Sequence, residues 1–191
     1  MKTPLRYQIT EFDCGTVSLI NCVAYLFDRE DIPAELIKAI HTYTLDCYDD
    51  KGNLGEGGTS REAVKFLSRW LTSYSETKDF GVKCTYLSGK DVTLEQIKHC
   101  IKNGGCVNFR TYQEVEHYVT ITGIDDSYLY IFDPYFQDVN TYVNDRYIDL
   151  IDNEPFKYNR KVSIDRFLSN KRLECALGPI NKRECVLFRK K

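Results

Sequence analysis

The sequence lacks any apolar run that approaches the roughly 20 residues of a membrane-spanning helix. It also lacks the apolar stretch of a secretory signal, because residues 1–6 lead directly into polar and aromatic sequence. These two absences predict a protein without a membrane segment that works in the cytoplasm.

A strong charge of either sign is missing as well. The 191 residues carry a formal net charge of −2, from 26 basic and 28 acidic side chains. This balance gives no reason to expect nucleic acid or a membrane surface as a partner. No internal repeat or low-complexity tract interrupts the chain, and 42% hydrophobic residues are enough for the core of one domain over residues 1–191.

Closely spaced cysteines are absent too. None of the eight cysteines belongs to a Cys-x-x-Cys pair, so the ligand spacing of a zinc site is missing. Most are expected to be buried small hydrophobic residues in a reducing compartment. We therefore expect no metal and no organic cofactor, and a single cysteine needs a chemical explanation. The eight are Cys14, Cys22, Cys47, Cys84, Cys100, Cys106, Cys175 and Cys185.

The first half of the sequence is predicted to be mainly helical. A helix is expected to begin near Asp13, with apolar side chains on nearly every side, and a second follows Pro33. Residues 59–62 and 93–96 each have the form of a capping box that opens a further helix. Residues 46–58, which are acidic and rich in glycine, predict a loop.

The second half changes to antiparallel strands. The strand runs are rich in Val, Ile, Phe, Tyr and Thr, and they cover residues 106–110, 117–124 and 128–132. A short helix around 164–168 and a strand near 185–188 are expected to close the domain, and 135–161 is interpreted as an insertion or long loop. This order predicts an α+β fold, with a helical part at about 1–104 and a β part at about 105–191.

Cys14 is expected in the first turn of the first helix. The positive end of a helix dipole stabilises a thiolate, as a neighbouring imidazolium does. Asp13 is the expected N-cap, and Gly15, which has no side chain, would let a substrate backbone come close. The position predicts a reactive thiol, which then needs a base.

His117 is the best placed of the three histidines to serve as that base. It opens an apolar strand, and Asp133 ends the next strand sixteen residues later. If residues 125–127 turn the chain, the two strands are antiparallel, and the start of the first lies beside the end of the second. An acid at that place holds the imidazole in one tautomer and orientation. His41 and His99 lie on predicted helices and are expected to be structural.

Gln8 stands six residues before Cys14. Its side-chain amide, together with the backbone N–H of Cys14, would form an oxyanion hole for the tetrahedral intermediate of acyl transfer. Each of these signals is weak by itself, because an isolated Asp-Cys-Gly or a histidine at the start of a strand is more often structural. Their order and spacing together favour a catalytic site.

This combination resembles the C39 family of papain-like cysteine peptidases, best known as the leader-peptide-cleaving domains of bacteriocin-exporting ABC transporters. The resemblance covers roughly residues 5–135 and implies a papain-like fold, in which a helical subdomain carries the cysteine and an antiparallel β-sheet subdomain carries the histidine. The resembling residues are Gln8, Asp13-Cys14-Gly15, His117-Tyr118-Val119 and Asp133-Pro134.

The resemblance also implies a role for each of four residues. Cys14 would be the nucleophile, and His117 would act as general base and general acid. Asp133 would orient the imidazole, and Gln8 would donate a hydrogen bond to the oxyanion. The implied reaction is the hydrolysis of peptide bonds in a peptide or protein substrate.

The sequence departs from the transporter-fused members of that family, because no transmembrane segments and no P-loop follow the domain. A stand-alone C39-like domain is therefore expected, and a separate transporter or maturation partner and the oligomeric state stay open. Residues 46–58 and 135–161 look longer than a minimal domain needs, and both would reshape the substrate groove. Two alternatives also stay open: other thiol acyl transfer, such as deamidation, transamidation or isopeptide cleavage, and a peptide-binding module with a vestigial site.

Overall fold

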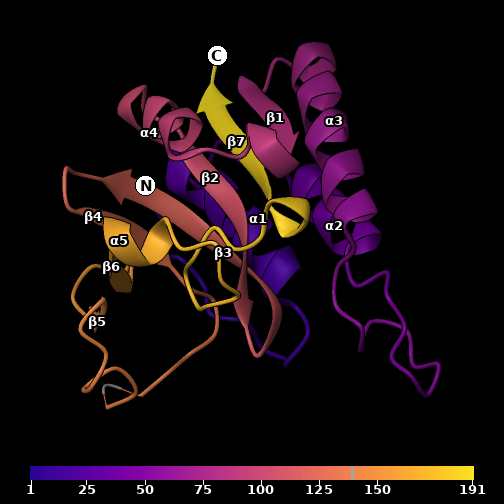
Figure 1. Cartoon of the computed structure of the whole chain (residues 1–191). Helices are drawn as coiled ribbons and strands as arrows, with labels where there is room; N and C mark the ends of the chain where they lie inside the picture. The colour runs from indigo at the N-terminus through magenta and orange to yellow at the C-terminus, as the bar shows by residue number, and fades with distance from the viewer. Residues whose placement is uncertain (139) are drawn as a thin grey trace.

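The computed structural model describes residues 1–138 and 140–191, which form one antiparallel sheet with helices on both faces (Figure 1). The helices are α1 (Cys14–Leu26), α2 (Ala34–Tyr43), α3 (Arg61–Lys78), α4 (Leu94–Lys102) and α5 (Ile164–Phe167). The strands are β1 (Val82–Ser88), β2 (Cys106–Gln113), β3 (Val115–Ile124), β4 (Tyr128–Phe132), β5 (Ile148–Leu150), β6 (Arg160–Ser163) and β7 (Glu184–Lys190). They lie in the order β1-β7-β2-β3-β4-β6-β5.

The helices begin where their sequence signals predict. α1 starts directly after Asp13, and α2 starts directly after Pro33. At the start of α4 the side chain of Thr93 accepts a hydrogen bond from the N–H of Gln96, as a capping residue does. At α3 the capping residue is Ser60, one position later than the predicted box implies.

Alternating side chains of the strands divide the apolar residues into two cores. On β7, Val186 and Phe188 belong to the core that α1, α2 and α3 cover, whereas Cys185 and Leu187 belong to the core that α4 and α5 cover. Figure 1 shows α4 in front of the sheet and α1 behind it. None of the helices formed by the described residues is long and apolar enough to cross a membrane.

The hairpin between β3 and β4 forms as predicted. The carboxylate of Asp125 accepts hydrogen bonds from the backbone N–H groups of Ser127 and Tyr128, at 2.8 and 2.7 Å. These bonds close the turn, so Thr120 on β3 lies opposite Phe132 on β4. The start of β3 therefore lies close to the residues that follow β4.

Three strand assignments correct the sequence prediction. β1 lies in the half predicted to be helical, and β5 and the start of β6 lie within the predicted loop of residues 135–161. The boundary near residue 104 therefore does not separate helices from strands. β1 is held by a partner distant in sequence, because it pairs along its whole length with β7. The strands β5 and β6 are short and pair with each other, and β6 also pairs with β4. Strands of three or four residues leave little local pattern to detect.

Candidate active site

Cys14 is the first residue of α1, and its side chain is buried at 8% exposure. The first helical turn closes through the N–H of Val17, which donates to the carbonyl of Asp13 at 2.9 Å. The N–H groups that precede Val17 have no acceptor within the helix. The sulfur is therefore held at the positive end of the helix dipole, with free N–H groups beside it.

The structure bears out one prediction for the residues that flank Cys14 and contradicts the other. Asp13 is the N-cap residue of α1, as predicted, but its carboxylate accepts no hydrogen bond from the helix: it accepts from the N–H groups of Ile9 and Thr10, at 3.2 and 2.9 Å, and stabilises the preceding loop. Gly15 does not leave room for a substrate, because a Cβ at this position would come within 2.8 Å of the Cβ of Thr59. A glycine is required there so that α1 can pack against the segment before α3.

The structure brings His117 and Asp133 together. His117 lies on β3 and Asp133 directly follows β4, and the antiparallel pairing places His117 Nε2 2.7 Å from Asp133 Oδ1. Both side chains are buried, at 5% and 1% exposure. Because Nε2 is engaged by the carboxylate, only Nδ1 of the ring is left to face another group.

Asp133 is held by residues that the sequence analysis did not single out. Asn159 accepts from the N–H of Asp133 and donates to its carbonyl, both at 2.8 Å. The N–H of Tyr135 donates to Asp133 Oδ1 at 2.8 Å. The buried guanidinium of Arg160 lies nearby, and its charge favours the ionised carboxylate. The segment 135–161 therefore supports the site, and no spacing motif marks these residues in the sequence.

The electrostatics of His117 favour its protonated form. Burial lowers the pKa of His117, but the charge and hydrogen bond of Asp133, together with a hydrogen bond and the charge of Cys14, outweigh burial and raise it to about 10. Burial raises the pKa of Asp133, whereas His117 and Arg160 lower it, with a net decrease. The imidazole is therefore a cation at neutral pH, placed between the carboxylate and the thiol.

This shift predicts a pH dependence of stability. A group whose pKa is raised by folding contributes stability that is complete below its unfolded value, near 6.5, and is lost as the pH rises towards the folded value. Between pH 6.5 and 8, the unfolding free energy of Cys14→Ala should fall more steeply than that of the double variant Cys14→Ala/His117→Ala, by up to about 1.4 kcal/mol per pH unit, because without the thiol the proton taken up by the imidazole on folding is not offset by one lost from Cys14. Urea denaturation at four pH values measures both slopes, and equal slopes would contradict the assignment.

Two side-chain hydrogen bonds fix α1 against β3. Ser18 Oγ donates to the carbonyl of Tyr118 at 2.8 Å, and Thr120 Oγ1 donates to the carbonyl of Ser18 at 3.1 Å. All three residues are buried, so each bond stabilises the packing in a low-dielectric environment. Ser18 lies one helical turn after Cys14 and Tyr118 follows His117, so these bonds set the position of the thiol relative to the imidazole.

Gln8 lies beside the turn that follows β4. Its backbone N–H donates to the carbonyl of Pro134 at 2.8 Å, and Asn21 on α1 makes two hydrogen bonds to the backbone of Arg6 that hold this segment in place. Gln8 Nε2 donates to the carbonyl of Thr10 at 2.7 Å, so one of its two amide hydrogens remains for another acceptor. Gln8 is not among the residues that line the groove described next.

Cys14 and His117 line a common groove with a volume of about 710 Å³. Residues 56–62 form one wall, and Arg110, Val115 and Glu116 of the β2–β3 hairpin belong to the other. The Gly-Gly-Thr-Ser sequence at 57–60 therefore lies at the rim of the site.

The predicted loop of residues 46–58 is anchored to the start of α3. The carboxylate of Asp46 accepts from the N–H and the hydroxyl of Ser60, at 2.8 and 2.5 Å. The N–H of Cys47 donates to the carbonyl of Gly58 at 3.2 Å, and a Cβ on Gly57 would lie 2.8 Å from that of Cys47. The close packing gives the groove a defined wall on this side.

The remaining cysteines and histidines lie outside this arrangement, except Cys47, which lines the groove. All eight cysteines are free thiols. His41 lies on α2 and His99 lies on α4. Among the described residues no group of three or more His, Cys, Asp or Glu side chains is arranged to hold a metal ion.

Comparisons with known proteins identify relatives of this chain. The sequence model of the Peptidase_C39 like family matches residues 2–158. A crystal structure of a C39-like peptidase from Bacillus anthracis has a TM-score of 0.54 at 17% identity, over 98% of this chain and 94% of the other. A second crystal structure is of a double glycine motif protease from an AMS/PCAT transporter in complex with the leader peptide. It has a TM-score of 0.49 at 16% identity, over 100% of this chain and 93% of the other. A search of curated proteins gives no match.

The likeness to the Bacillus anthracis structure shows a shared fold. The predicted fold class, α+β and papain-like, is confirmed: helices and an antiparallel sheet are combined, with a cysteine at the start of the first helix and a histidine on the sheet.

Proposed function

The chain belongs to the Peptidase_C39 like family, and we propose that it is a cysteine peptidase with Cys14 as its nucleophile. The observation that carries the proposal is the geometry of the groove. Cys14 at the start of α1 and His117 on β3 line the same groove, and His117 Nε2 lies 2.7 Å from Asp133. This arrangement supports the proposed roles of nucleophile, base and orienting acid in acyl transfer.

In the proposed acylation step, the Cys14 thiolate attacks the carbonyl carbon of a peptide bond. The imidazolium of His117, protonated at neutral pH, then transfers its proton to the leaving amine. The oxyanion would be stabilised by the backbone N–H of Cys14 and by the remaining amide hydrogen of Gln8. Asp133 keeps Nε2 occupied, so that proton transfer runs through Nδ1.

In the proposed deacylation step, water attacks the thioester. His117, now neutral, accepts a proton from the water as it attacks, and the carboxylate of Asp133 stabilises the imidazolium that forms. Collapse of the tetrahedral intermediate releases the carboxylic acid and restores the Cys14 thiolate. The two steps use side chains and one backbone N–H of this chain, together with a water molecule.

The proposed substrate is a peptide or protein segment that lies in the groove. Deamidation, transamidation and isopeptide cleavage remain alternatives, because they use the same nucleophile and base and differ in the acyl acceptor and the shape of the groove. A peptide-binding module without catalysis is the second candidate, and it is favoured by the position of Gln8 outside the lining residues.

Thiol reactivity separates the peptidase from the binding module. With iodoacetamide at pH 7, Cys14 should be labelled at least about tenfold faster than the other cysteines, because a thiolate paired with an imidazolium is the reactive form. Cys47 also lines the groove, but burial and the nearby Asp46 raise the pKa of its thiol, so it should react slowly. Mass spectrometry of proteolytic fragments after timed labelling gives the rate at each cysteine.

Two histidine variants complete this experiment. His117→Ala should slow the labelling of Cys14 by about tenfold or more, whereas His41→Ala, which removes an exposed histidine on α2, should leave the rate unchanged. If Cys14 in the wild type were labelled no faster than the half-buried Cys47 and Cys84, the binding module would be favoured and the proposed peptidase would fail.

A further inference from the structure

Arg110 on β2 is a groove residue without a hydrogen-bonding partner of its own. It lines the same groove as Cys14 and His117, and its side chain is only 16% exposed. A guanidinium has five N–H donors, yet Arg110 donates no side-chain hydrogen bond among the described residues, and its Nε is fully buried and unsatisfied. A largely desolvated guanidinium of this kind is costly unless an acceptor reaches it.

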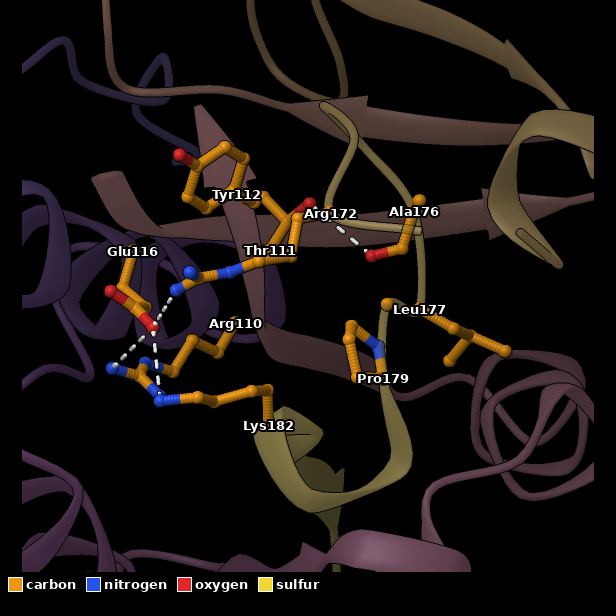
Figure 2. A pocket seen from close by; sticks show the side chains of 10 residues that line it. Arg110, Thr111, Tyr112, Glu116, Arg172, Ala176, Leu177, Pro179 and Lys182 are labelled. Atoms are coloured by element: carbon orange, nitrogen blue, oxygen red, sulfur yellow. Dashed lines mark hydrogen bonds and ion pairs between the residues drawn. The ribbon is translucent and has the colours of Figure 1, made fainter. Parts of the chain in front are cut away.

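The first nearby carboxylate, that of Glu116, is already engaged by other cations. Figure 2 shows Arg110, Arg172 and Lys182 converging on Glu116. Arg172 donates to Glu116 Oε1 at 2.7 Å, and Lys182 Nζ lies 3.7 Å from the same oxygen. Arg110 approaches that oxygen only to 4.0 Å, which is too long for a hydrogen bond. Three cations therefore share one acidic group.

The second carboxylate whose charge Arg110 influences is that of Glu184, which is completely buried. Tyr118 donates to its Oε1 at 3.0 Å, and Arg61 Nε lies 3.1 Å from its Oε2, which accepts no hydrogen bond from the described residues. No described ion pair within 4.0 Å joins Glu184 to Arg110. Of the four glutamates that line the groove, only Glu116 lies within 4.0 Å of Arg110 among the described residues. Among the described residues, the positive charge of Arg110 is therefore not matched by a carboxylate of its own.

We infer that Arg110 is the specificity-determining residue of a carboxylate subsite in the groove, where it binds an acidic group of the peptide substrate. This inference rests on the proposed peptidase function and adds a substrate class to it. A guanidinium binds a carboxylate through two parallel hydrogen bonds, which a lysine at the same position cannot reproduce. The acidic group belongs either to an Asp or Glu side chain or to the C-terminus of the peptide.

Cleavage of a synthetic peptide library, followed by mass spectrometry, tests the subsite in the wild type and in Arg110→Gln. For the peptides that are cleaved fastest, we compare kcat/KM between each acidic residue and its amide counterpart, and between a free C-terminus and a C-terminal amide. The wild type should prefer the acid at one position by about tenfold or more in kcat/KM, the size expected for a hydrogen bond to a charged group. The position that responds identifies the source of the carboxylate.

The ratio between acid and amide peptides is the readout, because it is insensitive to a general loss of activity. Arg110→Gln should reduce this ratio to about one, and Arg110→Lys should restore only part of it. Arg69→Gln removes the same charge from an exposed position of α3 outside the groove and should keep the ratio of the wild type. A wild type without acid preference, or an Arg110→Gln variant that retains it, overturns the subsite.

A second probe does not depend on cleavage. Iodoacetate and iodoacetamide differ in one negative charge, so the ratio of their rates at Cys14 reports the positive charge close to the thiol. Arg110→Gln should lower the iodoacetate rate relative to the iodoacetamide rate by about threefold or more, and Arg69→Gln should not. If Cys14 fails to react with either reagent, the proposed peptidase fails; if it reacts but the ratio is unchanged in Arg110→Gln, the subsite fails.

Discussion

Replacing Cys14 with alanine is expected to abolish peptide hydrolysis, with kcat lowered by about a thousandfold or more. The reason is that the Cys14 sulfur is the atom proposed to form the covalent intermediate, and alanine offers no nucleophile in its place. The measurement is mass spectrometry of a peptide library incubated with wild type and variant at equal concentration. The residues on either side of the bonds that only the wild type cleaves also define its sequence preference.

The matched control for this variant is Cys22→Ala. Cys22 lies two turns further along α1, is completely buried and belongs to the apolar core, so the same chemical change is made on the same helix. It should cost about 1 kcal/mol of stability and leave the cleavage rate within about twofold. If Cys14→Ala kept full activity, the assignment of the nucleophile would be wrong, and an equal loss in both variants would indicate a folding defect.

Replacing Arg160 with glutamine is expected to lower the unfolding free energy by about 2–4 kcal/mol, because it removes a buried cation that donates hydrogen bonds to the carbonyls of Asn159 and Tyr135. Arg160 and Asp133 are each only 1% exposed. Asp133 Oδ2 and Arg160 Nε have no hydrogen-bond partner among the described residues, so their attraction acts through space. Without the cation, Asp133 would be a buried carboxylate balanced by His117 alone.

The loss of Arg160 should also change the activity at low pH. Because the charge of Arg160 lowers the pKa of Asp133, its removal should allow this carboxylate to take up a proton at higher pH. The acid limb of the pH–activity profile should therefore move upward, whereas a merely structural role would lower activity at every pH. Arg160→Lys, which keeps the charge and loses the fork of donors, should restore part of both properties.

Urea denaturation at pH 7 measures the stability part of this prediction. The control is Arg29→Gln, which makes the same change at a side chain with 61% exposure and should alter stability by no more than about 0.5 kcal/mol. A loss below about 1 kcal/mol for Arg160→Gln, or an unchanged acid limb, would show that Arg160 does not support Asp133.

The sequence predicted the elements whose signals are local. Thr93 at the start of α4 and Pro33 before α2 act on their own helix, so they could be interpreted without knowledge of the fold. β1 carries a local signal that the prediction missed, because apolar residues at 82, 84 and 86 alternate with polar ones at 83 and 85 and face one core. Its place at the edge of the sheet could not be predicted, since that comes from pairing with β7, about a hundred positions later. The short strand β5 is likewise defined by its partner β6.

The candidate site was predictable where chain order fixes geometry. A turn between two adjacent strands must place His117 beside Asp133, and the structure has this contact. The charged neighbours Arg110 and Arg160 left no such signal, because a single arginine in a strand has no spacing that distinguishes a buried charge from an exposed one. The role expected for Gly15 was wrong because its neighbour, Thr59, is supplied by a distant segment.

The hydrogen bonds between Ser18 and β3 also have a consequence for protein synthesis. They join residues 100 positions apart in the chain, so the thiol meets its base only after the central strands have emerged and paired with the first helix. A ribosome-bound chain that ends before β3 carries Cys14 without His117. If the chain is the proposed peptidase, the nascent chain therefore has no activity on its neighbours until the step that completes the tertiary structure.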